Sequence, residues 1–153
     1  MNRFVLLAAM TFALPAPALA GPVSDTVRYF YETFKFEGAP EMRDRFADPA
    51  KAKFDKNDRL IESGDNVGCI DFSLALDAQD YDEAEVARTL KLEEKLSGDS
   101  AEVTAQFRIF AEGDDTERQI LWSLENVGGV WKITDIASKT GDWRLSEFYC
   151  DSE

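Results

Sequence analysis

The feature that most constrains the fold is a series of strand patterns between Val86 and Ala137. In residues 101–111 apolar side chains alternate with polar ones, which is typical of a strand that buries one face. Three turn sequences, each with residues that tolerate positive φ, separate four such patterns. These turns are Ser97-Gly98-Asp99, Glu112-Gly113-Asp114-Asp115 and Asn126-Val127-Gly128-Gly129. We therefore expect a four-stranded antiparallel meander with one apolar face.

Helical patterns flank the meander on both sides. Apolar residues recur at three- and four-residue spacing in residues 23–34, and residues 41–62 read as two short helices interrupted at Asp48-Pro49. Asp142 is placed to cap a last helix that closes the chain. The predicted fold is α+β, with N-terminal helices packed on a curved four-stranded antiparallel meander and a short C-terminal helix closing it.

The first twenty residues have the pattern of an export signal. Arg3 precedes an apolar run from Phe4 to Leu14, and Ala18-Leu19-Ala20 matches a cleavage site. The run is shorter than the roughly 20 residues that a membrane-spanning helix needs. We expect a signal peptide over 1–20, cleavage before Gly21 and one domain over 21–153, periplasmic or secreted and without stable membrane insertion. An uncleaved N-terminal anchor is the alternative.

The chain is acidic, with 30 Asp and Glu residues against 17 Lys and Arg and a formal net charge of −13. The basic residues are interleaved with acids and form no basic patch, so nucleic-acid binding is excluded. The acidity has two interpretations. It provides solubility alone, or it attracts a basic partner protein by electrostatic steering.

The two cysteines, Cys69 and Cys150, are predicted to form a disulfide in an oxidising compartment. The bridge would enclose about eighty residues, which the chain-entropy model values at roughly 4 to 5 kcal/mol. A reactive thiol is the alternative, although neither cysteine lies in a Cys-x-x-Cys motif.

Two segments of the sequence carry a family resemblance. Residues 129–142 contain Gly-x-Trp-x-Ile-x-Asp-Ile before a short loop, and residues 71–80 precede the meander. Both resemble an uncharacterised family of secreted bacterial domains, a domain of unknown function placed in the nuclear-transport-factor-2-like superfamily. The order of helices and strands also resembles the cone fold of that superfamily. The resemblance implies a cone-like fold and export, and it implies no activity.

No catalytic residue is predicted. The chain has no histidine, which removes the commonest general base, Ser-His-Asp and Cys-His catalysis and most zinc sites. Strand parity places Asp135 on the apolar face, with Arg88 as its expected partner. Asp135 is then either a pocket base or ligand anchor, or an acceptor for backbone amides of the following loop.

Two candidate sites remain, each with a structural alternative. The candidate ligand pocket, which ordinary core packing would also explain, comprises Tyr29, Tyr31, Arg88, Trp122, Trp131 and Asp135. The candidate calcium site, which a solvated acidic loop would also explain and which does not match an EF-hand, comprises Asp77, Asp80, Asp82 and Glu83. No cofactor is predicted.

Three functions fit these observations. The first is an exported, non-enzymatic binding module of the cell envelope that holds a small apolar ligand or a protein partner. The second is an acidic interaction protein, such as an inhibitor or immunity factor, that meets a basic envelope protein. The third is an isomerase or hydrolase acting through Asp135. Homodimerisation through the polar face of the sheet, where Phe110, Leu121 and Ile136 are apolar exceptions, also remains open.

Overall fold

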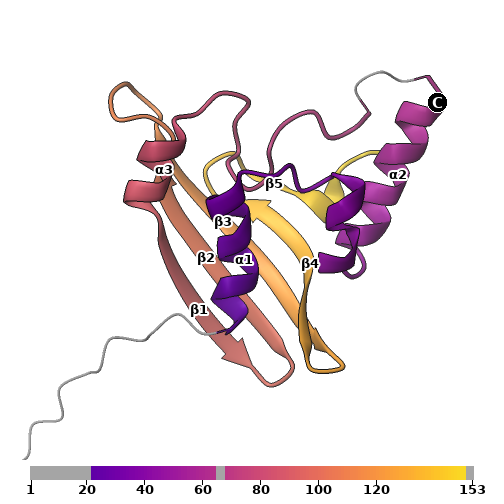
Figure 1. Cartoon of the computed structure of the whole chain (residues 1–153). Coiled ribbons are helices and arrows are strands. Elements are labelled where there is room, and N and C mark those ends of the chain that lie inside the picture. Colours follow the sequence, from indigo (N-terminus) through magenta and orange to yellow (C-terminus); the bar gives the residue numbers. More distant parts are fainter. Residues whose placement is uncertain (1–21, 65–67, 151–153) are drawn as a thin grey trace, which may run out of the picture.

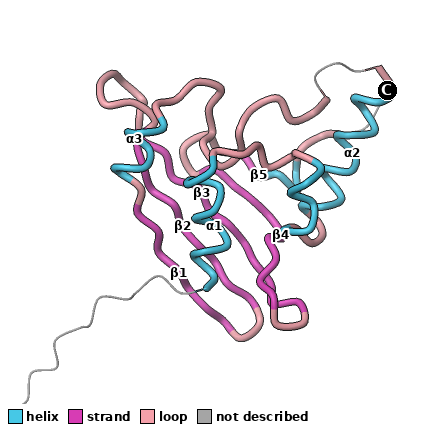
Figure 2. The backbone as a smooth tube through the Cα atoms, in the orientation of Figure 1, coloured by secondary structure: helices cyan, strands magenta, loops and turns pink. Residues whose placement is uncertain are grey.

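The computed structural model describes residues 22–64 and 68–150, so the predicted signal peptide lies outside the described residues. In the view of Figure 1 the first helix lies in front of a long twisted sheet and the other two α-helices lie on either side of it, and Figure 2 shows the same backbone by secondary structure. The helical elements are α1 (Pro22–Thr33), η1 (Pro40–Arg45), α2 (Ala50–Glu62), α3 (Glu83–Thr89) and η2 (Leu145–Glu147). The strands are β1 (Lys91–Ser97), β2 (Ser100–Arg108), β3 (Glu117–Val127), β4 (Val130–Ser138) and β5 (Trp143–Arg144).

The meander is present, but the fold prediction is wrong at its end. The sheet has five antiparallel strands in the order β1-β2-β3-β4-β5, and it is open rather than closed into a cone. Where a C-terminal helix was expected, Arg144 pairs with Ala137 and Trp143 with Ser138, and a short 3-10 turn follows. The physical reason is that the edge of β4 offers unpaired backbone groups, which the returning chain satisfies.

The start of the meander also differs from the prediction. Val86 lies in α3 rather than in a strand, and β1 begins only at Lys91. Asp82 ends the preceding loop as the cap of α3, because its Oδ1 accepts hydrogen bonds from the amides of Ala84 (2.9 Å) and Glu85 (3.1 Å). The cap at Asp82 therefore favours a helix at Val86, although the sequence pattern that follows predicted a strand there.

Two tight turns close one end of the sheet. Gly98 has a φ of 61° in the β1–β2 turn, and Gly128 and Gly129 have φ values of 63° and 87° in the β3–β4 turn. In the β3–β4 turn both central residues have positive φ, which is the geometry of a type I′ hairpin and which glycine adopts easily, whereas in the β1–β2 turn only the first central residue, Gly98, has positive φ. The glycines predicted as turn residues therefore form these turns.

A β-bulge in β4 reverses which side chains of the strand point to each face of the sheet. Trp122 pairs with Ile136 and Ser123 with Asp135, but Leu124 pairs with Ile133, which leaves Thr134 as an extra residue. Because paired residues share a face, Ile136 lies with Trp122 on the helix-covered face, and Asp135 lies with Ser123 on the opposite face. The parity prediction that placed Asp135 on the apolar face and Ile136 on the polar face is wrong for this reason.

Helix α1 fills the helix-covered face of the sheet. Phe30 stacks on Trp122 with 5.4 Å between ring centroids, and Tyr31 meets Phe107 edge to face at 5.2 Å. The Trp122 indole donates to the Tyr31 hydroxyl at 3.2 Å, and that hydroxyl donates to the Ala75 carbonyl at 2.9 Å. The buried aromatic residues are therefore packed against one another, with their polar atoms satisfied.

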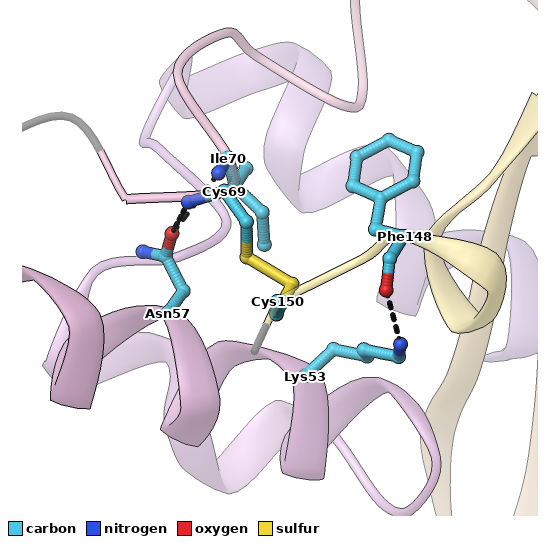
Figure 3. The surroundings of a disulfide bond; sticks show 6 residues. All are labelled: Lys53, Asn57, Cys69, Ile70, Phe148 and Cys150. Carbon is cyan, nitrogen blue, oxygen red and sulfur yellow. Dashed lines mark hydrogen bonds between the residues drawn. A yellow bond between two sulfur atoms is a disulfide. The ribbon is translucent and has the colours of Figure 1, made fainter. Parts of the chain in front are cut away.

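The predicted disulfide between Cys69 and Cys150 is confirmed, with a Cα–Cα distance of 5.3 Å (Figure 3). Helix α2 holds both ends of the bridge. Asn57 Oδ1 accepts the amides of Cys69 (2.8 Å) and Ile70 (3.0 Å), while Lys53 Nζ donates to the carbonyl of Phe148. Within residues 22–64 and 68–150, no helix is long and apolar enough to cross a membrane.

Candidate functional site

The residues of the expected ligand pocket do not surround one hollow. Tyr31 and Trp122 are fully buried in the core, and Trp131 is half-buried beside it. Tyr29 lies under the Arg45 guanidinium, whose carbon is 3.4 Å from the ring centroid. These aromatic side chains therefore pack within the fold.

Arg88 is placed differently from the prediction, because it lies on α3 and not on an inward-facing strand position. Its side chain is 65% exposed and contacts Glu85 through two nitrogens, with Nη2 2.7 Å from Oε2 and Nε 3.1 Å from the same oxygen. Glu85 is only 5% exposed and also lies 3.6 Å from Arg108. Arg88 thus pairs with Glu85 and not with Asp135.

Asp135 ties the segment after β4 back to the sheet. Its Oδ1 accepts the amides of Ile136 (3.0 Å) and Ser146 (3.1 Å), and its Oδ2 accepts the Ser146 hydroxyl (2.7 Å) and Arg144 Nη1 (2.9 Å). The residue is 7% exposed. Both carboxylate oxygens are therefore occupied by groups of β5 and η2.

The four acids of the expected calcium site serve separate purposes. Asp77 binds side chains of two other segments and Asp82 caps α3, while Asp80 and Glu83 are exposed. Among the residues that the structure describes, no group of three or more His, Cys, Asp or Glu side chains is arranged to hold a metal ion.

Three loops meet at the end of the sheet opposite the two glycine turns. We call this surface the loop end and define it as residues 71–82, 109–116 and 139–142; the top of Figure 1 shows its first two segments. The Asp82 amide donates to the Ile109 carbonyl at 2.8 Å, and the Ile109 amide donates to the Thr116 carbonyl at 2.8 Å. Binding residues are often found on loops that a rigid scaffold holds in place.

Asp77 and Arg118 join these loops to one another. The Asp77 carboxylate accepts the Trp143 indole (2.6 Å) and the Ser138 hydroxyl (2.7 Å), while its carbonyl accepts Arg118 Nε (3.2 Å). Arg118 Nη1 donates to the carbonyl of Asp115 at 2.7 Å. A Cβ on Gly141 would lie 2.5 Å from Asp77 Oδ2, so the 139–142 loop approaches Asp77 as closely as glycine allows. The loop end is therefore preorganised.

Glu37 fixes the start of the first loop. It is 1% exposed and accepts the Ser73 hydroxyl (3.0 Å) and the amides of Leu74 (3.1 Å) and Ala75 (2.9 Å). Burial raises the pKa of the Glu37 carboxyl, and the three donors oppose that rise. Burial likewise raises the pKa of the Tyr31 phenol well above its ordinary value.

The surface of the loop end is strongly acidic. Lys139 is the only basic residue in its three segments. The nearby Arg118 side chain donates hydrogen bonds to backbone carbonyl groups and forms an ion pair with Asp115. The exposed acids of the loop end are Asp71, Asp80, Asp82, Glu112, Asp114, Asp115 and Asp142.

Two hollows border this surface. The larger, of about 1000 Å³, lies between α3, the start of β1 and the β2–β3 loop, and its lining mixes Arg88 and Arg108 with Asp114 and Asp115. The smaller, of about 380 Å³, lies between the first and third loops. Its lining residues are Phe72, Asp77, Ala78, Gln79, Gly141 and Trp143.

Sequence reasoning missed Glu37, Arg118 and the joining role of Asp77. Each acts through contacts with residues 36 or more positions away, such as Glu37 with Ser73 and Arg118 with Asp77. The available signal was the acidic composition of residues 77–83, for which we considered a calcium site or a solvated loop, and not one part of a larger acidic surface.

No protein-family model matches the chain, and no curated protein matches it. Among solved structures, it is similar to a chain of the crystal structure of the type VI native effector–immunity complex Tae3–Tai3 from Ralstonia pickettii. The two chains are 18% identical with a TM-score of 0.51, and the match covers 77% of this chain and 94% of that chain. At this identity, the likeness shows a shared fold alone.

Proposed function

We propose that the protein is an exported, acidic interaction protein of the inhibitor or immunity type, which binds a basic partner protein through the loop end. The observation that carries the proposal is that exposed carboxylates dominate a surface made of three loops, which Asp77 and Arg118 fix to one another. The structural neighbour belongs to a type VI effector–immunity complex, which supports an assembly of this class.

Two physical effects favour binding at this surface. A concentrated negative potential steers a basic partner toward the loops and raises the association rate, more strongly at low salt. Loops that are already ordered lose less conformational freedom when they bind. The Cys69–Cys150 disulfide is consistent with an oxidising compartment, and we place this encounter in the periplasm.

The contacts within the fold support this choice over the two other functions. Phe30, Tyr31 and Trp122 pack together on the helix-covered face, where a small apolar ligand would have to lie. Both oxygens of Asp135, the carboxylate considered for catalysis, accept hydrogen bonds from Ser146 or Arg144. A partner can bind the acidic loop end without displacing the packed aromatic residues of the core or the hydrogen bonds of Asp135.

The test titrates the purified protein with each basic exported type VI effector encoded in the same genome, using isothermal calorimetry at 50 and 300 mM NaCl. We expect one effector to bind with 1:1 stoichiometry and to lose about tenfold or more in affinity at the higher salt, because a charge-steered complex is screened. If every effector fails to bind at 50 mM NaCl, or if the bound one is insensitive to salt, the proposal is contradicted.

A matched pair of variants locates the surface. Glu112→Gln with Asp114→Asn neutralises two exposed acids of the loop end, whereas Asp99→Asn with Glu125→Gln neutralises two exposed acids near the glycine turns. Both double variants change the net charge equally. We expect the first pair to weaken binding several-fold and the second to leave it nearly unchanged. Equal effects would mean that overall charge, and not the loop end, governs binding.

A further inference from the structure

The smaller hollow has an aromatic wall at the edge of the hydrophobic core. Phe72 and Trp143 line it and are both only half-buried, with ring centroids 5.5 Å apart and planes at 76°. Phe148 lies beside them, 5.5 Å from Trp143 and 6.2 Å from Phe72. Tryptophan and other aromatic residues left at the surface of a rigid fold are typical anchors of protein interfaces.

Negative charge surrounds the same hollow. Asp77 contributes to its lining, and the groups that donate to its carboxylate, the Trp143 indole and the Ser138 hydroxyl, are both neutral. Three exposed carboxylates, Asp71, Asp80 and Asp142, each adjoin a lining residue in the sequence. The Gln79 side-chain amide also donates to the Asp71 carbonyl at 3.4 Å, which brings that position to the rim.

Aromatic rings next to carboxylates form an environment that favours a guanidinium group. The rings attract a cation through their π faces, and the carboxylates add charge-assisted hydrogen bonds. Arginine suits such a site better than lysine because its planar head is weakly hydrated and stacks on aromatic faces. The fold already uses this contact internally, since Arg43 lies 5.1 Å from the Phe54 ring centroid and Arg45 lies 3.4 Å from that of Tyr29.

We propose that the hollow between Phe72, Asp77, Gln79, Gly141 and Trp143 binds an arginine side chain of the partner protein, and that this contact anchors the partner on the loop end. The hollow, at about 380 Å³, has room for a single arginine side chain. The inference rests on the proposed function for the origin of the arginine, whereas the chemistry of the hollow can be tested without any partner.

The first experiment titrates the ¹⁵N-labelled protein with Nα-acetyl-arginine amide and follows the indole N–H signals by NMR. We expect the Trp143 indole and the Gly141 amide to shift saturably at millimolar concentration. The indole of Trp131, which lies on β4 outside this hollow, is the internal control and should not move. The same titration with the citrulline amide, a neutral isostere, should produce no saturable shift.

The outcome that overturns the proposal is a Trp143 signal that does not respond, or one that responds equally to arginine and citrulline. Shifts spread over all acidic loops without saturation would also contradict it, because they would indicate non-specific attraction. Asp142→Asn should weaken arginine-amide binding several-fold, whereas Asp99→Asn near the glycine turns should leave it unchanged.

The second experiment measures effector affinity for Phe72→Ala, which truncates the aromatic wall and leaves the Asp77–Trp143 hydrogen bond in place. We expect a loss of tenfold or more. An unchanged affinity would overturn the anchoring role while leaving the proposed function standing. If no effector binds the unaltered protein but the arginine amide does, the proposed function fails and the chemistry assigned to the hollow stands.

Discussion

Asp135 shows, at the residue scale, how a single carboxylate organises a chain segment. It accepts hydrogen bonds from the amide and hydroxyl of Ser146 and from Arg144, all of which follow β4. Asp135→Asn keeps one acceptor but removes the charge and places an amide donor opposite Arg144. We expect a loss of about 1–3 kcal/mol in the free energy of unfolding, measured by urea denaturation. Ser146→Ala, which removes one donor, should cost less; an unchanged stability in Asp135→Asn would contradict this account.

Glu37 should make the free energy of unfolding decrease as pH rises, which is opposite to the effect of most carboxyl groups in folded proteins. Because burial raises its pKa above the ordinary value of 4.5, the folded state binds a proton more tightly than the unfolded state does. The resulting stabilisation is complete below the unfolded pKa and is lost as pH rises through the raised folded value.

The matched variant for this prediction is Glu37→Gln, which does not titrate. The free energy of unfolding of the natural protein, relative to that of the variant, should fall as pH rises upward from about 4.5 in a series of urea titrations. A difference that stays constant, or that increases with pH, would contradict the raised pKa.

At the scale of elements, the disulfide joins the loop after α2 to the end of the chain across 81 residues of sequence. The double variant Cys69→Ala with Cys150→Ala should lose up to about 4 to 5 kcal/mol of stability, since the loop closure in the unfolded chain is removed. Hydrogen exchange should rise in residues 143–150 more than in β2 and β3. Uniform exchange across the molecule would argue against this local role.

Gly141 tests whether the loop end is held by close contact. A Cβ at this position would lie 2.5 Å from Asp77 Oδ2 and 2.8 Å from Trp143. Gly141→Ala should therefore separate Asp77 from Trp143, cost about 1–3 kcal/mol and accelerate amide exchange in residues 71–82 and 139–142. Gly98→Ala has open space around it and should affect only its own turn. Unaltered exchange at the loop end in Gly141→Ala would refute the contact.

The sequence predicts the parts of this fold that depend on local patterns. Alternation in residues 101–111 and the glycine turns at 98 and 128 correspond to β2 and the two hairpins. The bulge at Thr134 has no local signature, and it places Asp135 on the opposite face from that predicted by simple parity. Pairing of Trp143 and Arg144 with β4 depends on a free strand edge, which only the assembled sheet provides.

The candidate site was harder to predict than the fold for a related reason. The acidic residues of 71–82, 109–116 and 139–142 are separated in the sequence, and each segment alone resembles a solvated loop or, around residues 77–83, a metal site. Antiparallel connections bring the three segments to one end of the sheet, and Arg118 joins two of them through the carbonyls of Asp77 and Asp115. The acidic surface is therefore a property of the topology.

In the molecule as a whole, the two ends of the sheet differ in structure and in charge. One end has two short glycine turns, and the other has three interlocked loops with exposed carboxylates and a half-buried aromatic wall. The disulfide and helix α2 hold the chain that follows β5, so the aromatic residues of that segment are fixed relative to the sheet (Figure 3). This difference between the two ends is the reason why we propose the loop end, and not the glycine turns, as the binding surface.

The most direct test of this account is hydrogen–deuterium exchange of the protein with and without the basic effector that we propose as its partner. We predict that amides in residues 71–82, 109–116 and 139–142 become protected in the complex, while the turns at Gly98 and Gly128 exchange as before. Protection confined to the glycine turns or to α1, with the loop end unchanged, would contradict the central claim that the acidic loops form the binding surface.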